Sequence, residues 1–177
     1  ELDRMAEVGA HDISISLDSL IPALHDRING GYDESWTDAL EKVAHINASF
    51  PEDSFCALGC VLAPTNIDEI VPLVHFATAI GWWVSLVPAH QSDPHRPRSF
   101  STFDPALVFD PADFGRVRAV LDEVRELKRR GFNLYDSDEY LDDIYRYVTN
   151  APIRWRRRND DVCDSPNLYF AIQPNGE

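Results

Sequence analysis

The fold is decided by residues 55–80, which read FCALGCVLAPTNIDEIVPLVHFATAI. The apolar run Phe55–Ala63 has the length and composition of a strand buried on both faces, as is typical of parallel sheets. Asn66 follows this run and, with Glu69 three residues later, forms the pattern of a capping box that opens a helix. Apolar residues at helical spacing then continue to Gly81. A buried strand followed at once by a helix indicates a βα unit.

Similar units flank this one on both sides. Strict alternation predicts a strand over His11–Asp18, and a helix over Trp36–Ala48 is predicted with its cap between Asp33 and Ser35. Trp82–Val87 is predicted as a third strand, closed by Pro88. Two helices follow: one opens at Asp110-Pro111 and ends at Arg130-Gly131, and the other spans Asp138–Val148 with Ser137 as its cap.

The alternation of strands and helices predicts an α/β fold with a parallel sheet, either flat or curved as in a barrel. Only three strands are evident in the sequence. A sheet of three parallel strands would leave two edges exposed, so we expect the chain to be part of a larger fold.

The composition excludes several classes of function. The chain has 177 residues, with 16 Lys and Arg against 30 Asp and Glu, for a net charge of −14. Such an acidic protein is repelled by nucleic acid and by anionic membranes. No apolar run approaches the ~20 residues that cross a bilayer, and no signal peptide is evident, so we expect a cytoplasmic protein. The one basic cluster is Arg154–Arg158, a candidate site for an anion.

Two of the three cysteines, Cys56 and Cys60, form a C-x3-C pair. A cluster-binding C-x3-C-x2-C motif would need a third cysteine where Ala63 stands. Because the pair lies in the middle of a predicted strand and four residues apart, both side chains point to the same face. We therefore predict two buried thiols rather than metal ligands.

Polar residues follow each predicted strand. Ser16 and Asp18 end the first strand, and Asn66 follows the second. His90 and His95 lie in the long loop Ala89–Asp110 after the third. Ligands of α/β proteins bind at this carboxyl edge of the sheet. The alternative for Asp18 and Asn66 is that they only cap turns.

Four segments, in this order, resemble the second half of a radical S-adenosylmethionine (radical SAM) enzyme. Ile13–Ser19 resembles the family's fourth barrel strand, and His25–Gly30 is similar to its H-D-x-x-R-G stretch with the arginine shifted. Asn66–Ile70 resembles the N-x-x-E-I that follows the fifth strand, and Trp82–Pro88 resembles the sixth strand. The family's cluster motif, C-x3-C-x2-C, is absent from this chain, whose simplest interpretation is a portion of a longer enzyme.

Cys163 and Gly176 add a C-x12-G pattern, similar to the opening of the cysteine motif in SPASM and twitch extensions. The resemblance implies that residues 1–131 are the C-terminal half of a partial (β/α) TIM-type barrel. Residues 132–177 would then be a connecting helix and the start of a SPASM/twitch-like extension.

The resemblance also implies a reaction. In this family a 4Fe-4S cluster splits SAM, and the resulting 5′-deoxyadenosyl radical abstracts hydrogen from a peptide or a small metabolite. An electron donor such as a flavodoxin or a ferredoxin would reduce the cluster. Two other hypotheses stay open: a cluster-free relative that binds or scaffolds, and a fragment of an unrelated α/β barrel.

The site residues are carried over by position. For SAM these are the hydroxyl of Ser16 and Asp18 at the end of the first strand, Arg27 at the carboxylate, Asn66 near the ribose, and the backbone of Leu86 and Val87 near adenine. Cys163 would ligate an auxiliary iron–sulfur cluster, and the substrate-side candidates are His90, His95 and Arg156.

Overall fold

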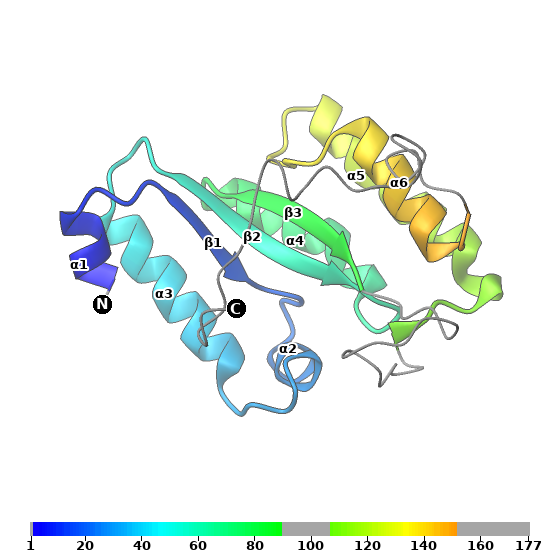
Figure 1. Ribbon diagram of the computed structural model, residues 1–177, viewed down its shortest axis with the longest axis horizontal. Coiled ribbons are helices and arrows are strands. Elements are labelled where there is room, and N and C mark those ends of the chain that lie inside the picture. Colours follow the sequence, from blue (N-terminus) through cyan, green and yellow to red (C-terminus); the bar gives the residue numbers. More distant parts are fainter. Residues whose placement is uncertain (1, 90–106, 152–177) are drawn as a thin grey trace, which may run out of the picture.

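The computed structural model describes residues 2–89 and 107–151. In this part of the chain three strands, β1 (Asp12–Ser16), β2 (Phe55–Leu62) and β3 (Trp83–Pro88), form a parallel sheet in the order β1-β2-β3 (Figure 1). The α-helices are α1 (Leu2–Glu7), α2 (Pro22–Ile28), α3 (Ser35–Ser49), α4 (Ile70–Ala79), α5 (Phe114–Arg129) and α6 (Asp138–Val148). Short 3-10 turns, η1 (Ile67–Glu69) and η3 (Pro111–Asp113), precede α4 and α5. The prediction of an α/β fold with parallel strands alternating with helices is confirmed.

A short fourth segment extends the sheet beyond β3. The Val84 amide donates to the Asn133 carbonyl at 2.9 Å, and the Tyr135 amide donates to the Val84 carbonyl at 2.8 Å. This makes a parallel bridge between Val84 and Leu134. Each strand therefore lies beside the one before it in the chain, without the reversal of order that defines a doubly wound sheet.

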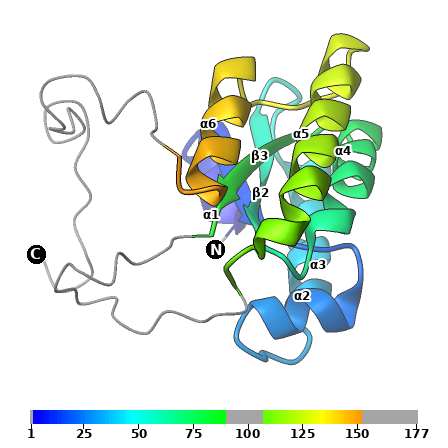
Figure 2. The same cartoon turned by 90° about the vertical axis from the view of Figure 1, so that its right-hand side faces the viewer.

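The helices α3, α4 and α5 lie on one side of the sheet (Figure 2). The strand residues on that side are buried in the core, among them Leu58, Leu62 and Leu86. The amphipathic spacing of α5 buries Val117, Leu121, Val124 and Leu127 in the same core. Helix α6 packs against α5 beside β3. One core therefore forms between the sheet and a single layer of helices.

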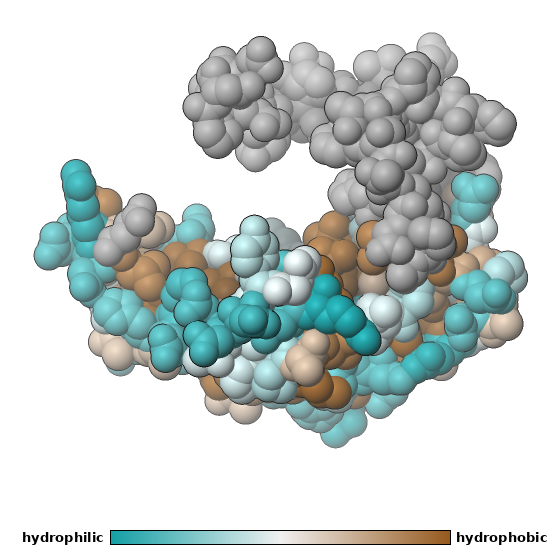
Figure 3. Space-filling view, turned by 90° about the horizontal axis from the view of Figure 1, so that it is seen from below, coloured by the Kyte–Doolittle hydropathy of each residue, from teal (hydrophilic) through white to brown (hydrophobic). Residues whose placement is uncertain are grey.

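The other side of the sheet is what we call the open face. It carries the alternate residues of each strand: Asp12, Ser14 and Ser16 from β1; Phe55, Ala57, Gly59 and Val61 from β2; Trp83, Ser85 and Val87 from β3. Val61, Trp83 and Val87 are among the large apolar residues exposed in the described chain. In contrast, the surface seen from the side of α2 and α3 is largely hydrophilic, with smaller apolar patches (Figure 3).

One of the predicted helix caps is wrong, and a second lies at the predicted place, Glu34, but lacks a side-chain bond. Asn66 and Glu69 do not form a capping box, because Asn66 has no side-chain cap bond and both side chains bind elsewhere. Helix α3 begins after Glu34, which has a left-handed φ of 67° and no side-chain cap bond. The start of α3 is instead held by Asp26 of α2, whose Oδ1 accepts bonds from the Ser35 hydroxyl (2.8 Å) and the Trp36 amide (2.9 Å).

Other local predictions are confirmed. Ser137 caps α6 by accepting the Tyr140 amide at 3.1 Å, and Asp110 caps η3 by accepting the Ala112 amide at 2.8 Å. Cys56 and Cys60 are both buried, and burial raises the pKa of both thiols. The first strand is shorter than predicted: it ends at Ser16, although the Leu17 amide still donates to Gly59 of β2.

Several predicted residues lie outside the described part of the chain. They are the histidines of the long loop and the candidates of the C-terminal region: His90, His95, Arg156 and Cys163. Within residues 2–89 and 107–151, no helix combines the length and the apolar character that a membrane span requires.

Candidate functional site

Asp18 ties the end of β1 to its neighbours. The residue is 3% exposed. Its Oδ1 accepts the Val61 amide of β2 at 2.7 Å, and its Oδ2 accepts the Asn29 side-chain amide at 3.3 Å. The strand shifts here from main-chain pairing to side-chain pairing, since a carboxylate takes the place of a backbone carbonyl. Asp18 is therefore built into the carboxyl edge of the sheet rather than directed into solvent.

Asn66 completes the same edge from the other side. It is fully buried, and its amide nitrogen donates to the backbone carbonyls of Asp18 and Val61, each at 2.8 Å. Its side-chain oxygen accepts the Ala63 amide at 2.9 Å. Buried backbone groups need such partners, because an unpaired one costs about as much as a lost hydrogen bond. The geometry thus favours the alternative of a turn-capping role for Asn66 over contact with a ribose.

Glu69 holds the loop that follows Asp18. Its Oε2 accepts the Ser19 hydroxyl and the Leu20 amide, both at 3.1 Å. The Ser19 oxygen in turn accepts the Ile21 amide at 2.9 Å. The two residues expected to cap a helix therefore bind the β1–α2 loop, 48 to 50 positions away in the chain.

His25 is the third anchor of this loop and is 2% exposed. Its Nδ1 accepts the backbone amide of Asp18 at 3.1 Å, so the proton of the neutral ring is on Nε2. Burial lowers the pKa of His25, although Asp18 and Asp26 act in the opposite direction. We call Asp18, Ser19, His25, Asn29, Asn66 and Glu69 the strand-end network.

A second buried carboxylate, Asp136, lies at the β3 edge. Its Oδ2 accepts the Leu86 amide at 2.7 Å, its Oδ1 accepts the Ser85 hydroxyl at 3.1 Å, and the Lys128 ammonium donates to its backbone carbonyl. Burial raises the pKa of Asp136 to about 6, while the bonds from Leu86 and Ser85 and the charge of Lys128 act against that rise. The Leu86 amide, predicted to lie near adenine, is therefore used by Asp136.

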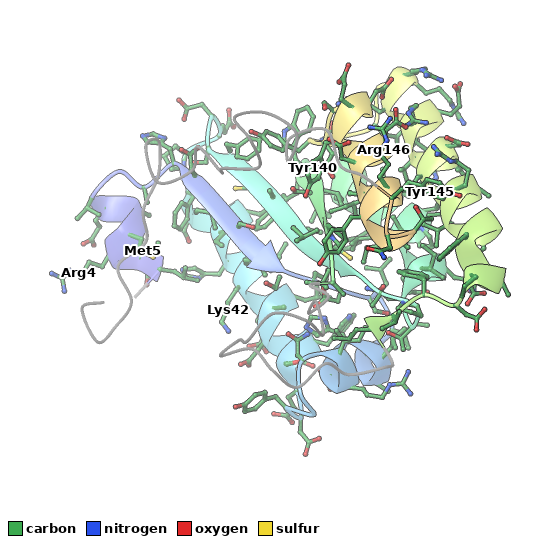
Figure 4. The ribbon with its side chains drawn as sticks, turned by 45° about the vertical axis from the view of Figure 1, so that its right-hand side comes forward. Arg4, Met5, Lys42, Tyr140, Tyr145 and Arg146 are labelled. Carbon is green, nitrogen blue, oxygen red and sulfur yellow. The ribbon has the colours of Figure 1, made fainter. Side chains whose placement is uncertain are left out.

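Sequence reasoning did not find Asp136, because it stands 50 positions from its partner and in no motif. The structure also shows Tyr140 nearby, on the side of α6 toward the sheet, whereas Tyr145 faces α5, where Arg118 lies 3.8 Å from the ring centre (Figure 4). Burial and the charge of Asp136 both raise the pKa of Tyr140.

The open face carries the accessible groups of the site. Ser16 lies opposite Gly59, and Gly59 lies opposite Ser85, so two serines flank a glycine in one row across three strands. Ser16 is exposed, as is Val87 at the carboxyl end of the same face. Arg27 is exposed on α2. The Ser16 hydroxyl can donate and accept, and the Ser85 hydroxyl, which donates to Asp136, can still accept, so this row can bind a polar ligand across Gly59, which has no side chain.

Aromatic residues lie on the open face toward its amino end. The Phe55 ring stacks on Trp83 with centroids 6.3 Å apart and meets Tyr135 at 5.4 Å. Tyr135 is 61% exposed. A surface hollow of about 500 Å³ lies farther away, between α1 and the end of α3. Its lining is two acidic residues, three apolar residues and one serine: Asp3, Glu7, Ala6, Phe50, Pro51 and Ser49.

No protein-family model, curated protein or solved structure matches this chain. The described residues also contain no group of three or more His, Cys, Asp or Glu side chains able to hold a metal ion. The functional interpretation therefore rests on the residues of the open face and the strand-end network.

Replacing Asn66 by Ala should destabilise the protein strongly. The change removes the Asn66 bonds of two buried backbone groups, on Asp18 and Ala63, and of one half-buried carbonyl, on Val61. Unsatisfied buried groups cost roughly 1–3 kcal/mol each, so we expect a loss of about 3 kcal/mol or more in urea denaturation. Asn66→Asp keeps the acceptor for Ala63 but turns a buried carboxylate oxygen toward the carbonyls of Asp18 and Val61, so it should destabilise the protein as well. A loss below about 1 kcal/mol for Asn66→Ala would show that the network is not stabilising.

Replacing Asp136 by Asn should change how stability depends on pH. The pKa of Asp136 is about 6 in the folded state and 3.8 ordinarily. Its protonation therefore stabilises the folded wild type fully below pH 3.8, and this contribution to the free energy of unfolding is lost as pH rises through 6. At about 1.4 kcal/mol per pKa unit, the loss approaches roughly 3 kcal/mol. Urea denaturation at pH 4 and pH 8 should show it in the wild type and not in Asp136→Asn. Equal pH dependence in the two proteins would contradict a raised pKa.

Proposed function

We propose that this chain is the C-terminal half of the partial (β/α) barrel of a radical SAM enzyme. The enzyme would bind SAM at the carboxyl end of the open face and act on a peptide or a small metabolite. The observation that carries the proposal is the parallel sheet in chain order, with one face under helices and the other open, ending in an exposed Ser16. An electron donor such as a flavodoxin or a ferredoxin is part of this proposal.

The topology supports a barrel over a flat sheet. A barrel adds each strand beside the previous one and keeps its helices outside, whereas a doubly wound sheet reverses its order and covers both faces. The described strands follow the first pattern, and Leu134 continues it beyond β3. The open face would then line the inside of the barrel.

The described residues do not fit the iron–sulfur cluster of the family. Such clusters are held by cysteine thiolates, yet Cys56 and Cys60 are buried in β2 and burial raises the pKa of both. The ligands of a 4Fe-4S cluster would have to come from other segments of the protein. Cys163, proposed as a ligand of an auxiliary cluster, lies outside the described residues.

Ser16 and Val87 of the open face, together with Arg27 of α2, fit the chemical groups of SAM. The exposed Ser16 hydroxyl can donate to or accept from the ribose or the amino-acid moiety. Arg27, exposed on α2, has the planar fork that pairs with a carboxylate. Val87 offers an apolar surface beside the adenine position. Asp18 and Asn66 would not contact SAM. Their hydrogen bonds would instead fix the strand ends, and so the position of Ser16.

A second candidate function is that of a cluster-free binding or scaffold protein. The aromatic row formed by the half-buried Phe55 with the exposed Trp83 and Tyr135 favours it, since contiguous exposed apolar surface marks interaction sites. The two candidates differ in what the rest of the gene encodes.

Sequencing the coding DNA on both sides of this segment tests the proposal directly. Three βα units of about 30 residues place the expected C-x3-C-x2-C about 90 residues upstream. A cysteine should also appear five positions after Gly176. A reading frame confined to residues 1–177 would overturn radical chemistry and favour the binding protein.

Replacing Ser16 by Ala should weaken binding of S-adenosylhomocysteine, a non-reactive analogue of SAM. Loss of a buried hydrogen bond costs roughly 1–2 kcal/mol, which corresponds to a rise of about 5- to 30-fold in Kd by calorimetry. Ser49→Ala, an exposed serine at the end of α3, is the matched control and should leave Kd unchanged. Equal affinity of the Ser16→Ala variant would remove Ser16 from the site.

A further inference from the structure

The loop between β1 and α2 is closed by two kinds of anchor. Glu69 accepts the Ser19 hydroxyl and the Leu20 amide through its Oε2. His25 accepts the Asp18 amide through Nδ1 at 3.1 Å, and this role needs a ring nitrogen without a proton. The His25 anchor is therefore lost when the ring is protonated.

Protonation changes what the His25 ring can do. The imidazolium carries a proton on both nitrogens and accepts no hydrogen bond. The Asp18 amide, buried beneath it, would then face another donor instead of an acceptor. An unsatisfied buried donor is costly, so the closed loop and the protonated ring oppose each other.

We propose that His25 is a proton-operated latch: the neutral ring holds the β1–α2 loop against the sheet, and its protonation releases Asp18. The Oδ1 of Asp18 also accepts a hydrogen bond from the Val61 amide, so release of Asp18 would loosen the contact between β1 and β2 at the carboxyl edge. The latch stands on these contacts alone. Only its effect on ligand binding at Ser16 depends on the proposed function.

The charged groups around the His25 ring do not cancel the lowering of its pKa by burial. Asp18, in the loop itself, and Asp26, on α2, favour the protonated ring, but burial outweighs them and lowers the pKa of His25. The Asp26 carboxylate is engaged with Ser35 and Trp36 of α3, which lowers its own pKa. The Asp18 carboxylate is engaged with Val61 and Asn29. Glu69 binds the other end of the loop, and the Cys60 thiol of β2 is kept protonated by burial.

The direction of the pH dependence follows from these facts. The closed loop holds His25 with a pKa below 6.5, whereas the released ring returns toward 6.5. Opening therefore takes up a proton, and the closed state is fully favoured above pH 6.5. As pH falls, closure weakens about tenfold for each pH unit until the pKa of the closed state is reached.

Hydrogen exchange of the Asp18 amide measures the latch in the intact chain. We expect its protection factor, corrected for intrinsic exchange, to fall as pH drops below 6.5, by at most about tenfold per pH unit. The Trp82 amide, bonded to the Ala77 carbonyl at 2.8 Å and distant from both His25 and Asp136 in the sequence, is the internal control, and protection of Asp18 should fall relative to it. Unchanged protection of Asp18 between pH 7.5 and pH 5 would overturn the proposal.

The variant His25→Asn separates the latch from general acid instability. The side-chain oxygen of Asn can accept where Nδ1 stood, and it does not titrate in this range. Protection of Asp18 should then be independent of pH, and the same acid loss as in the wild type would overturn the proposal. If this variant does not fold, an NMR titration of the wild-type His25 ring decides instead: a pKa at or above 6.5 would refute the latch.

Binding of S-adenosylhomocysteine distinguishes the two proposals. A working latch with a ligand at Ser16 should give weaker binding at pH 5.5 than at pH 7.5 in the wild type and no such change in His25→Asn. Absence of binding at both pH values would count against the proposed function while the exchange result still decides the latch. Binding with equal pH dependence in the two proteins would overturn the coupling of the latch to the site.

Discussion

The structure depends on how the backbone is satisfied where parallel strands end. At these ends the ladder stops, yet the surrounding apolar packing keeps water away from the last amides and carbonyls. Asp18 and Asn66 supply the missing partners: the Asp18 carboxylate accepts the Val61 amide of β2, and the Asn66 amide donates to the carbonyl of Asp18, just after β1, and to that of Val61. Loop direction, helix entry and the exposure of Ser16 follow from these bonds, because they fix where the chain leaves the sheet.

Sequence patterns predicted the strands and helices well because those signals are local. The apolar run of β2 and the Ser137 cap both depend on neighbours in the chain. The expected capping box does not form, because the side chains of Asn66 and Glu69 make hydrogen bonds to the β1–α2 loop instead. Asp136 was missed for the same reason. Its partners Ser85 and Leu86 lie on another strand, and no spacing rule connects residues so far apart.

The candidate site consists of residues that are accessible to a ligand and residues that fix their positions. Ser16, Arg27 and Val87 are accessible, whereas Asp18, Asn66 and Leu86 are buried and bonded within the protein. The family resemblance predicted both groups equally, since position in a motif ignores which way a side chain turns. The distinction appeared only when alternation along β1 and β3 was combined with the bonds of the buried set.

The two margins of the sheet differ in a way that bears on how the molecule can associate. Beyond β3, segment 133–136 covers the outer amides, and the Asp136 carboxylate occupies the position that another strand's carbonyl would need. Within the described chain, β1 pairs only with β2, so its outer margin keeps unused donors and acceptors. Such a margin is a template for polymerisation unless something covers it. Growth of the sheet, whether by further barrel strands or by aggregation, therefore has one direction available, outward from β1.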